Sequence, residues 1–424
     1  MFRITSLFII SLLYLSFAYQ DDYSGYKVYQ IVPNNEDELK TIQILIKHPQ
    51  MDVWTSSKLI GHPTVFMVPP TIDYRLRSSL RVNNLPYDTL IEDVQSTVVN
   101  EKHEQAAARR IASKQNGLLT FKQYERFDTI TWFLRNLTNL YPDIVQLINI
   151  GKSYEGRDLE VLKISSGGNE DKPAIFIDGG MHAREWISPA TVLYIISQLV
   201  ENYSENSALT DNIDWYIIPV INPDGYEYTH TMSRFWRKTR SVNLNTYCRG
   251  TDPNRNFDFH WNEVGASSDP CDEIFAGSDA FSERETDALS NFVLGVKQNI
   301  KLYLTFHSYG EYLLYPWGYT SALPHDFFEL ETVARRANAV ANKRYTVGSS
   351  TNVLYSAAGG SDDWFKGVAG VNLSYTIELP GGGLSGFDLP PSRIDEVVQE
   401  TFEMVKVFAG YIQEKFLYNR FLLH

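Results

Sequence analysis

The sequence of 424 residues has only two cysteines, fewer basic than acidic side chains, and no long apolar run beyond its N-terminus. Cys248 and Cys271 stand far apart, so neither belongs to a closely spaced pair that could hold a metal. The motif His-Glu-x-x-His is also absent, which excludes the zinc proteases built on it. The formal net charge of −13 would repel nucleic acid and anionic membranes, so we expect neither as a partner.

The first 18 residues have the pattern of a cleavable signal peptide. Arg3 provides a positive charge, the apolar run Leu7–Leu15 follows, and Ser16–Ala18 gives a small-residue exit. The run is too short to span a bilayer, although an N-terminal anchor helix is the alternative. We therefore expect a secreted, extracellular and soluble protein. In an oxidising compartment an isolated cysteine pair usually forms a disulfide, and two buried free thiols are the alternative. Sequons for N-glycosylation begin at Asn136, Asn202 and Asn372.

Residues from about Tyr26 to Gln95 have the pattern of a small unit with both helices and strands. The predicted order is strand, helix, strand, strand, helix, strand, which is the order of a ferredoxin-like sandwich. The predicted segments are Tyr26–Val32, a helix from Asn34 to Lys47, Asp52–Thr55, Thr64–Val68, Asp73–Val82 and Tyr87–Val94.

A charged, Ala-rich helix is predicted next, over Asn100–Asn116. It contains the pair Arg109-Arg110, and Lys114 follows shortly afterwards. Because this basic site lies between two domain-like units, we expect a trypsin-like protease to cut near Arg110 or Lys114. The predicted domains are a signal peptide over 1–18, a small domain with its connecting helix over 19–112, and a large domain over 113–424.

From Asp128 onward, helix-like and strand-like runs alternate. This pattern predicts an α/β domain with a mixed, mostly parallel twisted sheet flanked by helices. Ser282 with Glu285 has the spacing of a capping box at one helix start. The predicted strands are Val145–Ile150, Leu159–Ile164, Ala174–Asp178, Trp215–Ile221, Lys301–Phe306 and Leu373–Glu378. The predicted helices are Asp128–Leu140, Pro189–Tyr203, Ser282–Lys297, Asp326–Tyr345 and Arg393–Phe416.

Side chains that can bind a metal follow three of these predicted strands. His182 and Glu185 follow the strand ending at Asp178, His307 follows Phe306, and Glu378 ends its own strand. Functional groups in such folds gather beyond the carboxyl ends of the strands, so we expect these four to meet. Each histidine alone would more often be an ordinary loop histidine, but matching positions on three strands favour a metal site.

Two imidazoles and one carboxylate, with an open position, are the ligands of a catalytic zinc. His182, Glu185 and His307 supply this set, and one Zn²⁺ per chain is expected. Zinc lowers the pKa of the water that it binds by several units. Glu378 would then be the general base that takes a proton from this water and passes it to the leaving amine.

Seven motifs, in this order along the chain, closely resemble those of the pancreatic-type zinc metallocarboxypeptidases. The resemblance covers essentially the whole exported chain, and it implies that the small N-terminal domain is an activation prodomain that blocks the cleft. It also implies a hydrolase of C-terminal peptide bonds that is made as an inactive zymogen. The motifs are His182–Trp186, Asn222–Tyr226, Trp236–Arg240, Asn254–Phe257, His307–Tyr309, Ala358–Asp362 and Ile377–Leu379.

The resemblance assigns roles to further residues. It implies that Arg237 polarises the scissile carbonyl and that Asn254 and Arg255 grip the substrate's terminal carboxylate. Arginine suits this task because its planar fork binds a carboxylate through two bonds. Tyr355 would close over the substrate, and Cys248 would pair with Cys271. The remaining positions implied to line the cleft are Arg184, Ser308, Tyr309 and Phe387. Without the family match, surface salt bridges for the arginines and core packing for Tyr355 would be the ordinary interpretation.

Asp362 is the residue that the resemblance connects with substrate choice. The family position is acidic in enzymes that remove Lys or Arg and apolar in those that remove hydrophobic residues. We therefore expect a carboxypeptidase B-like preference, because an apolar substrate would leave a buried charge unpaired. A carboxylate in a helix cap or turn is the alternative. Two departures from the family pattern, Ser350 and the run Pro380–Gly383, lie near the expected cleft.

Three rival functions remain open from the sequence. They are a carboxypeptidase for aliphatic or aromatic termini, an inactive relative that binds peptides, and a purely structural secreted protein. The expected partners are peptide C-termini, an activating trypsin-like protease and proteinaceous carboxypeptidase inhibitors. The protein is expected to be a monomer.

Overall fold

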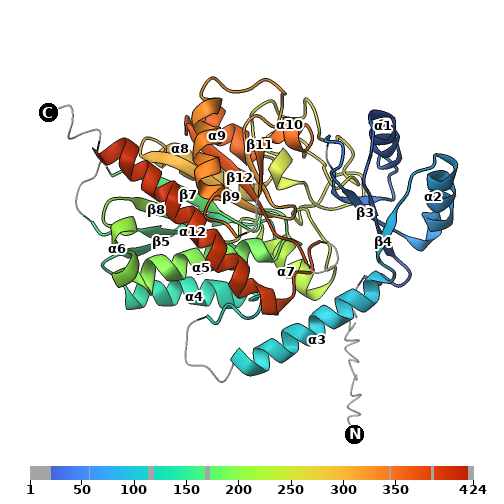
Figure 1. The fold of residues 1–424 in the computed structure, drawn as a ribbon. Helices are drawn as coiled ribbons and strands as arrows, with labels where there is room; N and C mark the ends of the chain where they lie inside the picture. Colours follow the sequence, from blue (N-terminus) through green and yellow to red (C-terminus); the bar gives the residue numbers. More distant parts are fainter. Residues whose placement is uncertain are drawn as a thin grey trace, which may run out of the picture.

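The computed structural model describes residues 21–56, 58–112, 119–167, 172–342, 345–382 and 386–418. Within these ranges a small N-terminal unit lies against a larger one (Figure 1). The predicted signal peptide and Lys114 lie outside the described residues. The predicted boundary at residue 112 adjoins the undescribed residues 113–118 and stays a prediction.

The N-terminal unit has the predicted ferredoxin-like order. Its sheet has the order β2-β3-β1-β4, and all its neighbouring strands are antiparallel. Asn35 caps α1, since its side chain accepts hydrogen bonds from the backbone N–H groups of Asp37 and Glu38. The elements are β1 (Lys27–Ile31), α1 (Glu36–Leu45), β2 (Asp52–Thr55), β3 (Thr64–Val68), α2 (Pro70–Val82) and β4 (Asp88–Ile91).

The connecting helix α3 (Val94–Ala112) begins six residues before the predicted start at Asn100. Its first turns are held by packing, because Val94 and Val98 are buried in an apolar cluster with residues of both units. In Figure 1 the helix runs away from the small unit along the lower edge of the large one. It carries Arg109 in its last turn, so the expected cleavage region lies at the far end of the helix.

The larger unit contains an eight-stranded sheet with the order β11-β10-β12-β9-β7-β8-β6-β5. Its central strands β12, β9, β7 and β8 are parallel neighbours, as predicted, and β10–β11 is also a parallel pair. The strands are β5 (Val145–Lys152), β6 (Asp158–Ile164), β7 (Ala174–Asp178), β8 (Asp214–Ile218), β9 (Ile300–Ser308), β10 (Tyr312–Tyr315), β11 (Thr346–Ser349) and β12 (Leu373–Leu379).

Helices cover both faces of this sheet (Figure 1). Alternate residues of β7 point to opposite faces, so Ile175 packs in one buried cluster and Phe176 in another. Helices α4, α5, α9 and α12 supply the first cluster, and α8 and α11 supply the second. The helices are α4 (Phe127–Leu140), α5 (Ile187–Val200), α6 (Tyr203–Thr210), α7 (Pro223–Thr231), α8 (Arg284–Val296), α9 (Phe327–Asn338), α10 (Ser350–Val353), α11 (Ser361–Gly367) and α12 (Ile394–Gln413). Short helical turns cover Pro253–Arg255, Pro391–Arg393 and Glu414–Tyr418.

The predicted capping box at Ser282 and Glu285 is wrong. The N-cap of helix α8 is Glu283, one residue after Ser282, and no side chain makes a capping hydrogen bond there. The Ser282 hydroxyl instead contacts Asn256 and Glu283, and Glu285 is buried, where it accepts the backbone N–H of Tyr154. Hydrogen bonds to residues outside the helix therefore replace the capping bonds that the sequence pattern predicted.

The predicted helix over Asp326–Tyr345 is too long, because α9 ends at Asn338. The Asn338 side chain bonds both the backbone carbonyl and the backbone N–H of Tyr345, which closes the turn that follows. The chain then enters β11, an edge strand that the sequence analysis did not predict. Among the described residues no helix is both long enough and apolar enough to cross a membrane.

Candidate active site

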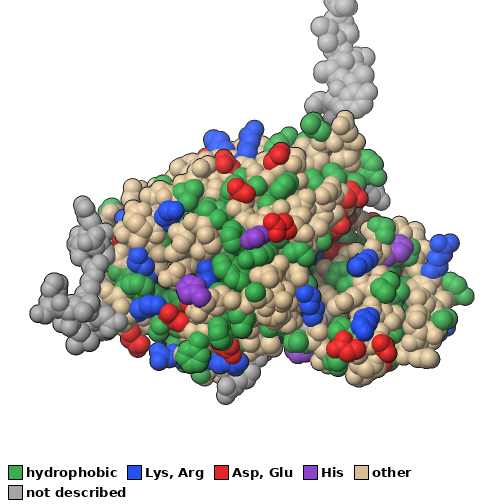
Figure 2. Space-filling view, turned by 90° about the horizontal axis from the view of Figure 1, so that it is seen from above, with side chains coloured by type: hydrophobic (Ala, Val, Ile, Leu, Met, Phe, Trp, Pro, Cys, Tyr) green, Lys and Arg blue, Asp and Glu red, His purple; other side chains and the backbone are tan. Residues whose placement is uncertain are grey.

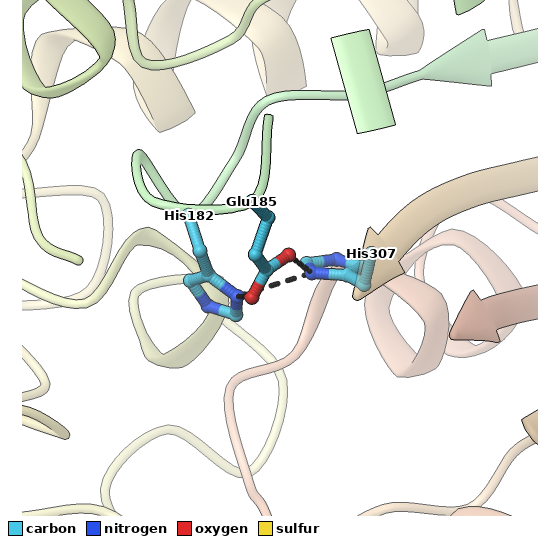
Figure 3. Close-up of side chains that lie close together, drawn as sticks. All are labelled: His182, Glu185 and His307. Atoms are coloured by element: carbon cyan, nitrogen blue, oxygen red, sulfur yellow. Dashed lines mark hydrogen bonds and ion pairs between the residues drawn. The ribbon is translucent and has the colours of Figure 1, made fainter. Parts of the chain in front are cut away.

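His182, Glu185 and His307 meet at the carboxyl ends of β7 and β9, as the strand pattern predicts (Figure 3). The Nδ1 atom of His182 lies 2.8 Å from Glu185 Oε1, and His307 Nδ1 lies 3.0 Å from Glu185 Oε2. The two Nδ1 atoms are 3.1 Å apart. Three donor atoms from two strand ends thus face one point, and all three side chains are buried.

These distances fit a small divalent cation. Zinc bonds of about 2.0–2.1 Å in a tetrahedron place neighbouring donor atoms about 3.3 Å apart. The observed separations of 2.8–3.1 Å are close to that edge length. Two imidazoles and a carboxylate leave a fourth position free, which is the donor set of a catalytic zinc site.

Asp252 orients one of the ligands from behind. Its Oδ1 lies 3.1 Å from His182 Nε2, so the other ring nitrogen of His182 is free to face the cation position. Asp252 Oδ2 accepts two hydrogen bonds from Arg237, at 2.8 and 3.1 Å. Burial opposes ionisation of Asp252, but Arg237 and His182 hold the pKa of its carboxyl well below the usual range. Asp252 was not among the site residues predicted from the sequence, although it stands two residues before the Asn254 motif.

Glu378 lies beside the ligands on the neighbouring strand. In the parallel pair of β12 and β9 it stands directly opposite His307. Burial raises the pKa of Glu378 to about 8, with Glu185 adding to the rise and His307 opposing it. Among the described residues its side chain forms no ion pair or hydrogen bond, so its carboxylate is available to the cleft that it lines.

A cleft extends from this centre, and most of the predicted site residues line it: Glu378, Arg237, Asn254, Arg255, Ser308, Tyr309, Tyr355, Asp362 and Phe387, with His182 and Glu185. Arg255 is buried, and its described hydrogen bonds use Nε and Nη1, both to backbone carbonyls. Its guanidinium lies 5.9 Å from the ring centre of Tyr355, which is 39% exposed. The structure therefore brings two arginines and a partly exposed tyrosine to the same cleft as the metal ligands.

Asp362 lies in the first turn of α11 and also faces the cleft. Gly360 holds the N-cap position, which argues against the alternative that Asp362 is a helix cap. Its Oδ2 lies 3.4 Å from the Ser350 hydroxyl, and burial raises the pKa of the carboxyl. Gly359 allows the segment that leads into α11 to pass close to the backbone of Arg255, because a Cβ at this position would lie 2.4 Å from the carbonyl oxygen of Arg255.

The N-terminal unit covers the outer part of the cleft. Trp54 and Thr55 at the end of β2 line it directly, and Trp54 stacks on Phe235 with ring centres 5.1 Å apart. Arg184 does not line the cleft but lies beneath this unit, with its Nη1 2.7 Å from Asp52 Oδ2. In Figure 2 the smaller lobe lies against the larger one at the right, with a hollow between them. Trp54 and Thr55 of the N-terminal unit therefore form part of the wall of the cleft.

The disulfide that the family resemblance implies is present, between Cys248 and Cys271. It joins two segments of the long connection between α7 and α8, which also carries Asp252, Asn254 and Arg255. Lys238 supports the same region, since its buried ammonium donates to the Pro270 carbonyl at 2.7 Å.

Together, the α/β sheet, the His-Glu-His cluster and the adjacent carboxylate define the class of a metal-dependent hydrolase. Comparison with known proteins narrows this class. Residues 130–404 match the family model of the zinc carboxypeptidases, and residues 29–101 match that of the carboxypeptidase activation peptide. The chain belongs to the zinc carboxypeptidase family, and it is a metallocarboxypeptidase that carries an activation peptide.

The similar proteins include carboxypeptidases B and a carboxypeptidase A. Carboxypeptidase B of Astacus astacus is 48% identical over 70% of this chain and all of the relative. Carboxypeptidase B of Helicoverpa zea is 39% identical over 95% of this chain and 97% of the relative. Among solved structures, carboxypeptidase A from Helicoverpa armigera has a TM-score of 0.87 at 32% identity, covering 93% of this chain and 99% of that chain.

Proposed function

We propose that the activated protein removes Lys and Arg from the C-termini of peptides and proteins, using one Zn²⁺ per chain. The observation that carries this proposal is the buried carboxylate of Asp362 in the cleft. Among the described residues it forms no ion pair, and burial disfavours its charge. A Lys or Arg side chain would supply the missing positive charge, whereas an apolar side chain would leave the carboxylate unpaired.

The proposed roles follow from the geometry of the cleft. His182, Glu185 and His307 would hold the zinc, which when bound supplies a Lewis acid and lowers the pKa of water. Glu378 would take the proton of the attacking water and deliver it to the leaving amine. Arg237, fixed by Asp252, would stabilise the oxyanion of the scissile carbonyl.

Recognition of a free C-terminus would come from Asn254, Arg255 and Tyr355. An exopeptidase must distinguish a terminal carboxylate from an internal amide, and a guanidinium does so through charge and paired hydrogen bonds. Ser308 would support the metal site, because its backbone N–H donates to Glu185 Oε2 at 3.1 Å and so helps to orient this ligand.

Synthesis as a secreted zymogen completes the proposal. The activation peptide implies proteolytic activation. We propose cleavage by a trypsin-like protease near Arg110 or Lys114 and action as a monomer outside the cell. Inhibition by small proteins is part of the proposal, since a bovine thrombin-activatable fibrinolysis inhibitor, 41% identical over 69% of this chain and 99% of that chain, was solved in complex with tick carboxypeptidase inhibitor, with a TM-score of 0.66.

The test is a terminal-residue profile after limited trypsin treatment. Peptides of one sequence that end in Lys, Arg, Leu or Phe are compared by kcat/KM, with and without a chelator. Cleavage of the Lys and Arg peptides, lost with the chelator and restored by zinc, supports the proposal. A preference for Leu or Phe would instead favour the carboxypeptidase A-like alternative. Stoichiometric zinc without turnover, after confirmed removal of residues before the cleavage site, would indicate an inactive relative.

A further inference from the structure

One of the three N-glycosylation sequons lies on the outward side of helix α4. Asn136 and Thr138 belong to it, and Asn136 is partly exposed. The opposite side of the helix is buried in the main core through residues such as Phe133 and Leu137. Figure 1 shows α4 at the lower edge of the larger unit. In the described chain the residues that line the cleft all come from other segments, so this sequon is separate from the active site.

Two exposed apolar side chains flank Asn136. Trp132 precedes it by four residues and is 51% exposed, and Leu140 follows it by four residues and is 60% exposed. Residues four positions apart are neighbours on a helix surface, so the three side chains form one continuous line. We call Trp132, Asn136 and Leu140 the α4 stripe. Within the described residues the indole N–H of Trp132 forms no hydrogen bond, so both its ring and its donor face solvent.

The direction of helical side chains decides which flank a group on Asn136 would cover. Each Cα–Cβ bond tilts toward the N-terminus of the helix, so a side chain lies over the preceding turn. The preceding turn carries Trp132. The Asn136 amide has no hydrogen-bond partner in the described ranges and is not enclosed, so solvent reaches its Nδ2 atom. A group attached to Nδ2 would therefore meet Trp132 before it meets Leu140.

The α4 stripe is too narrow for a protein partner. A stable protein interface buries roughly 800 Å² on each side, far more than two exposed side chains provide. Arg135 borders the stripe and forms exposed ion pairs with Asp158 and Glu160, at 3.3 and 2.9 Å. The stripe thus offers a small apolar surface with one hydrogen-bond donor and polar surroundings. This combination suits a sugar ring, which has an apolar C–H face and polar edges.

We propose that Asn136 carries an N-linked glycan whose first N-acetylglucosamine packs on the Trp132 ring. The proposal rests on secretion, because such glycans are added during export. Asn136 Nδ2 forms a bond to the anomeric carbon of the sugar and loses one proton, while the bond from that carbon to the diphosphate of a lipid-linked oligosaccharide donor breaks. Transfer precedes folding, so the helix does not block it and has only to leave room for the sugar.

The other two sequons have different surroundings. Asn202 is the N-cap residue of α6, and its backbone carbonyl accepts from the N–H groups of Glu205 and Asn206. Asn372 is exposed, but the serine of its sequon, Ser374, is buried and donates to the Asp362 backbone carbonyl at 2.8 Å. Neither lies inside a helix whose periodicity places a tryptophan one turn away. Both sequons therefore serve as internal comparisons when the modification is mapped.

The first experiment maps the modification on the full chain exported from eukaryotic cells. Peptide-N-glycosidase F in heavy-oxygen water labels each asparagine that carried a glycan, and mass spectrometry identifies it. We expect the label at Asn136 in most chains, and loss of one glycan in Asn136→Gln. Asn139→Gln, an exposed asparagine of the same helix outside any sequon, should keep that glycan. Exported protein with unmodified Asn136 would overturn the proposal, whereas a chain that is never exported would refute the proposed secretion and this site with it.

The second experiment tests the contact with Trp132. Endoglycosidase H leaves the first sugar on a high-mannose glycan, whereas peptide-N-glycosidase F removes it and leaves an aspartate. We expect the first treatment to leave Tm unchanged and the second to lower it by roughly 1–3 °C. This difference should vanish in Asn136→Gln, should shrink in Trp132→Ala and should persist in Leu140→Ala. An undiminished difference in Trp132→Ala would refute the packing of the sugar on the indole. If that variant does not fold, equal Tm values of the native chain after the two treatments would refute it instead.

Discussion

Replacing Asp362 by Asn tests the proposed substrate preference most directly. The change keeps the size of the side chain, and it keeps an oxygen that can accept from Ser350 and from Thr376, a second hydrogen-bond partner of the carboxylate. It removes only the charge that would meet a Lys or Arg side chain. Kinetic comparison of activated wild-type and variant proteins on peptides ending in Lys and Leu gives the effect.

The magnitude follows from burial. Asp362 is only 6% exposed and forms no ion pair in the described chain, so a bound lysine would be its direct counter-ion. Breaking a buried charge pair by removing one partner costs about 3–5 kcal/mol. We therefore expect kcat/KM for the Lys peptide to fall by roughly 100- to 4000-fold. The Leu peptide should be cleaved equally well or better.

Asp363→Asn is the matched control. Asp363 is the next residue on α11, but its oxygens accept the backbone N–H groups of Gly318 and Tyr319 and do not line the cleft. Its replacement should lower stability without changing the ratio of Lys to Leu cleavage. An unchanged ratio in Asp362→Asn, in a variant that folds and binds zinc, would refute the assignment of Asp362.

Three further predictions concern the catalytic base, the carboxylate clamp and a buried acid. Glu378→Gln should lower kcat by roughly 100- to 10,000-fold while zinc content, measured by elemental analysis, stays at one per chain; loss of zinc would make Glu378 a ligand. Arg255→Ala should raise KM for peptides with a free C-terminus by roughly 10- to 100-fold, and comparable cleavage of C-terminally amidated peptides by the unmodified enzyme would contradict this role. Burial raises the pKa of Glu285 from 4.5 to about 7, so its contribution to stability is present below pH 4.5 and is lost as pH rises through 7. Glu285→Gln should therefore stabilise the protein by about 2–3 kcal/mol more at pH 8 than at pH 5, measured by denaturant unfolding, and equal shifts at both pH values would contradict the assignment.

The metal site could be predicted because it depends on strand ends. A short apolar run such as Ile175–Asp178 indicates a buried parallel strand, and parallel strands align their carboxyl ends at one edge. His182, Glu185, His307 and Glu378 follow such ends, so their meeting required only the fold class. The same reasoning gives no information about Asp252, which comes from a long connection whose path the sequence pattern does not define.

The short strands β10 and β11 and the contacts between the two units could not be predicted from the sequence, for a different reason. Strands β10 and β11 contain only four residues each, too few for periodicity to distinguish them from loop. The pairs Asp52–Arg184 and Glu101–Arg234 join residues more than 130 positions apart. Each carboxylate looks like an ordinary solvated charge in the sequence, and only docking of the two units gives it a partner.

The structure also indicates that the residues that keep the precursor inactive are distinct from those that form the catalytic site. The ligand cluster, Arg237, Arg255 and Glu378 are already assembled in the chain that carries its activation peptide, and the activation peptide contributes none of these side chains. It contributes Trp54, which lines the cleft, and two carboxylates that pair with arginines of the larger unit. Asp52 pairs with Arg184, and Glu101 of the connecting helix α3 pairs with Arg234. Cleavage near Arg110 or Lys114, as proposed above, would cut the chain but break none of these contacts. The Glu101–Arg234 pair is bidentate and buried on both sides. Cutting the chain and releasing the activation peptide would therefore be two separate steps, and the second requires Asp52 and Glu101 to exchange their arginine partners for water.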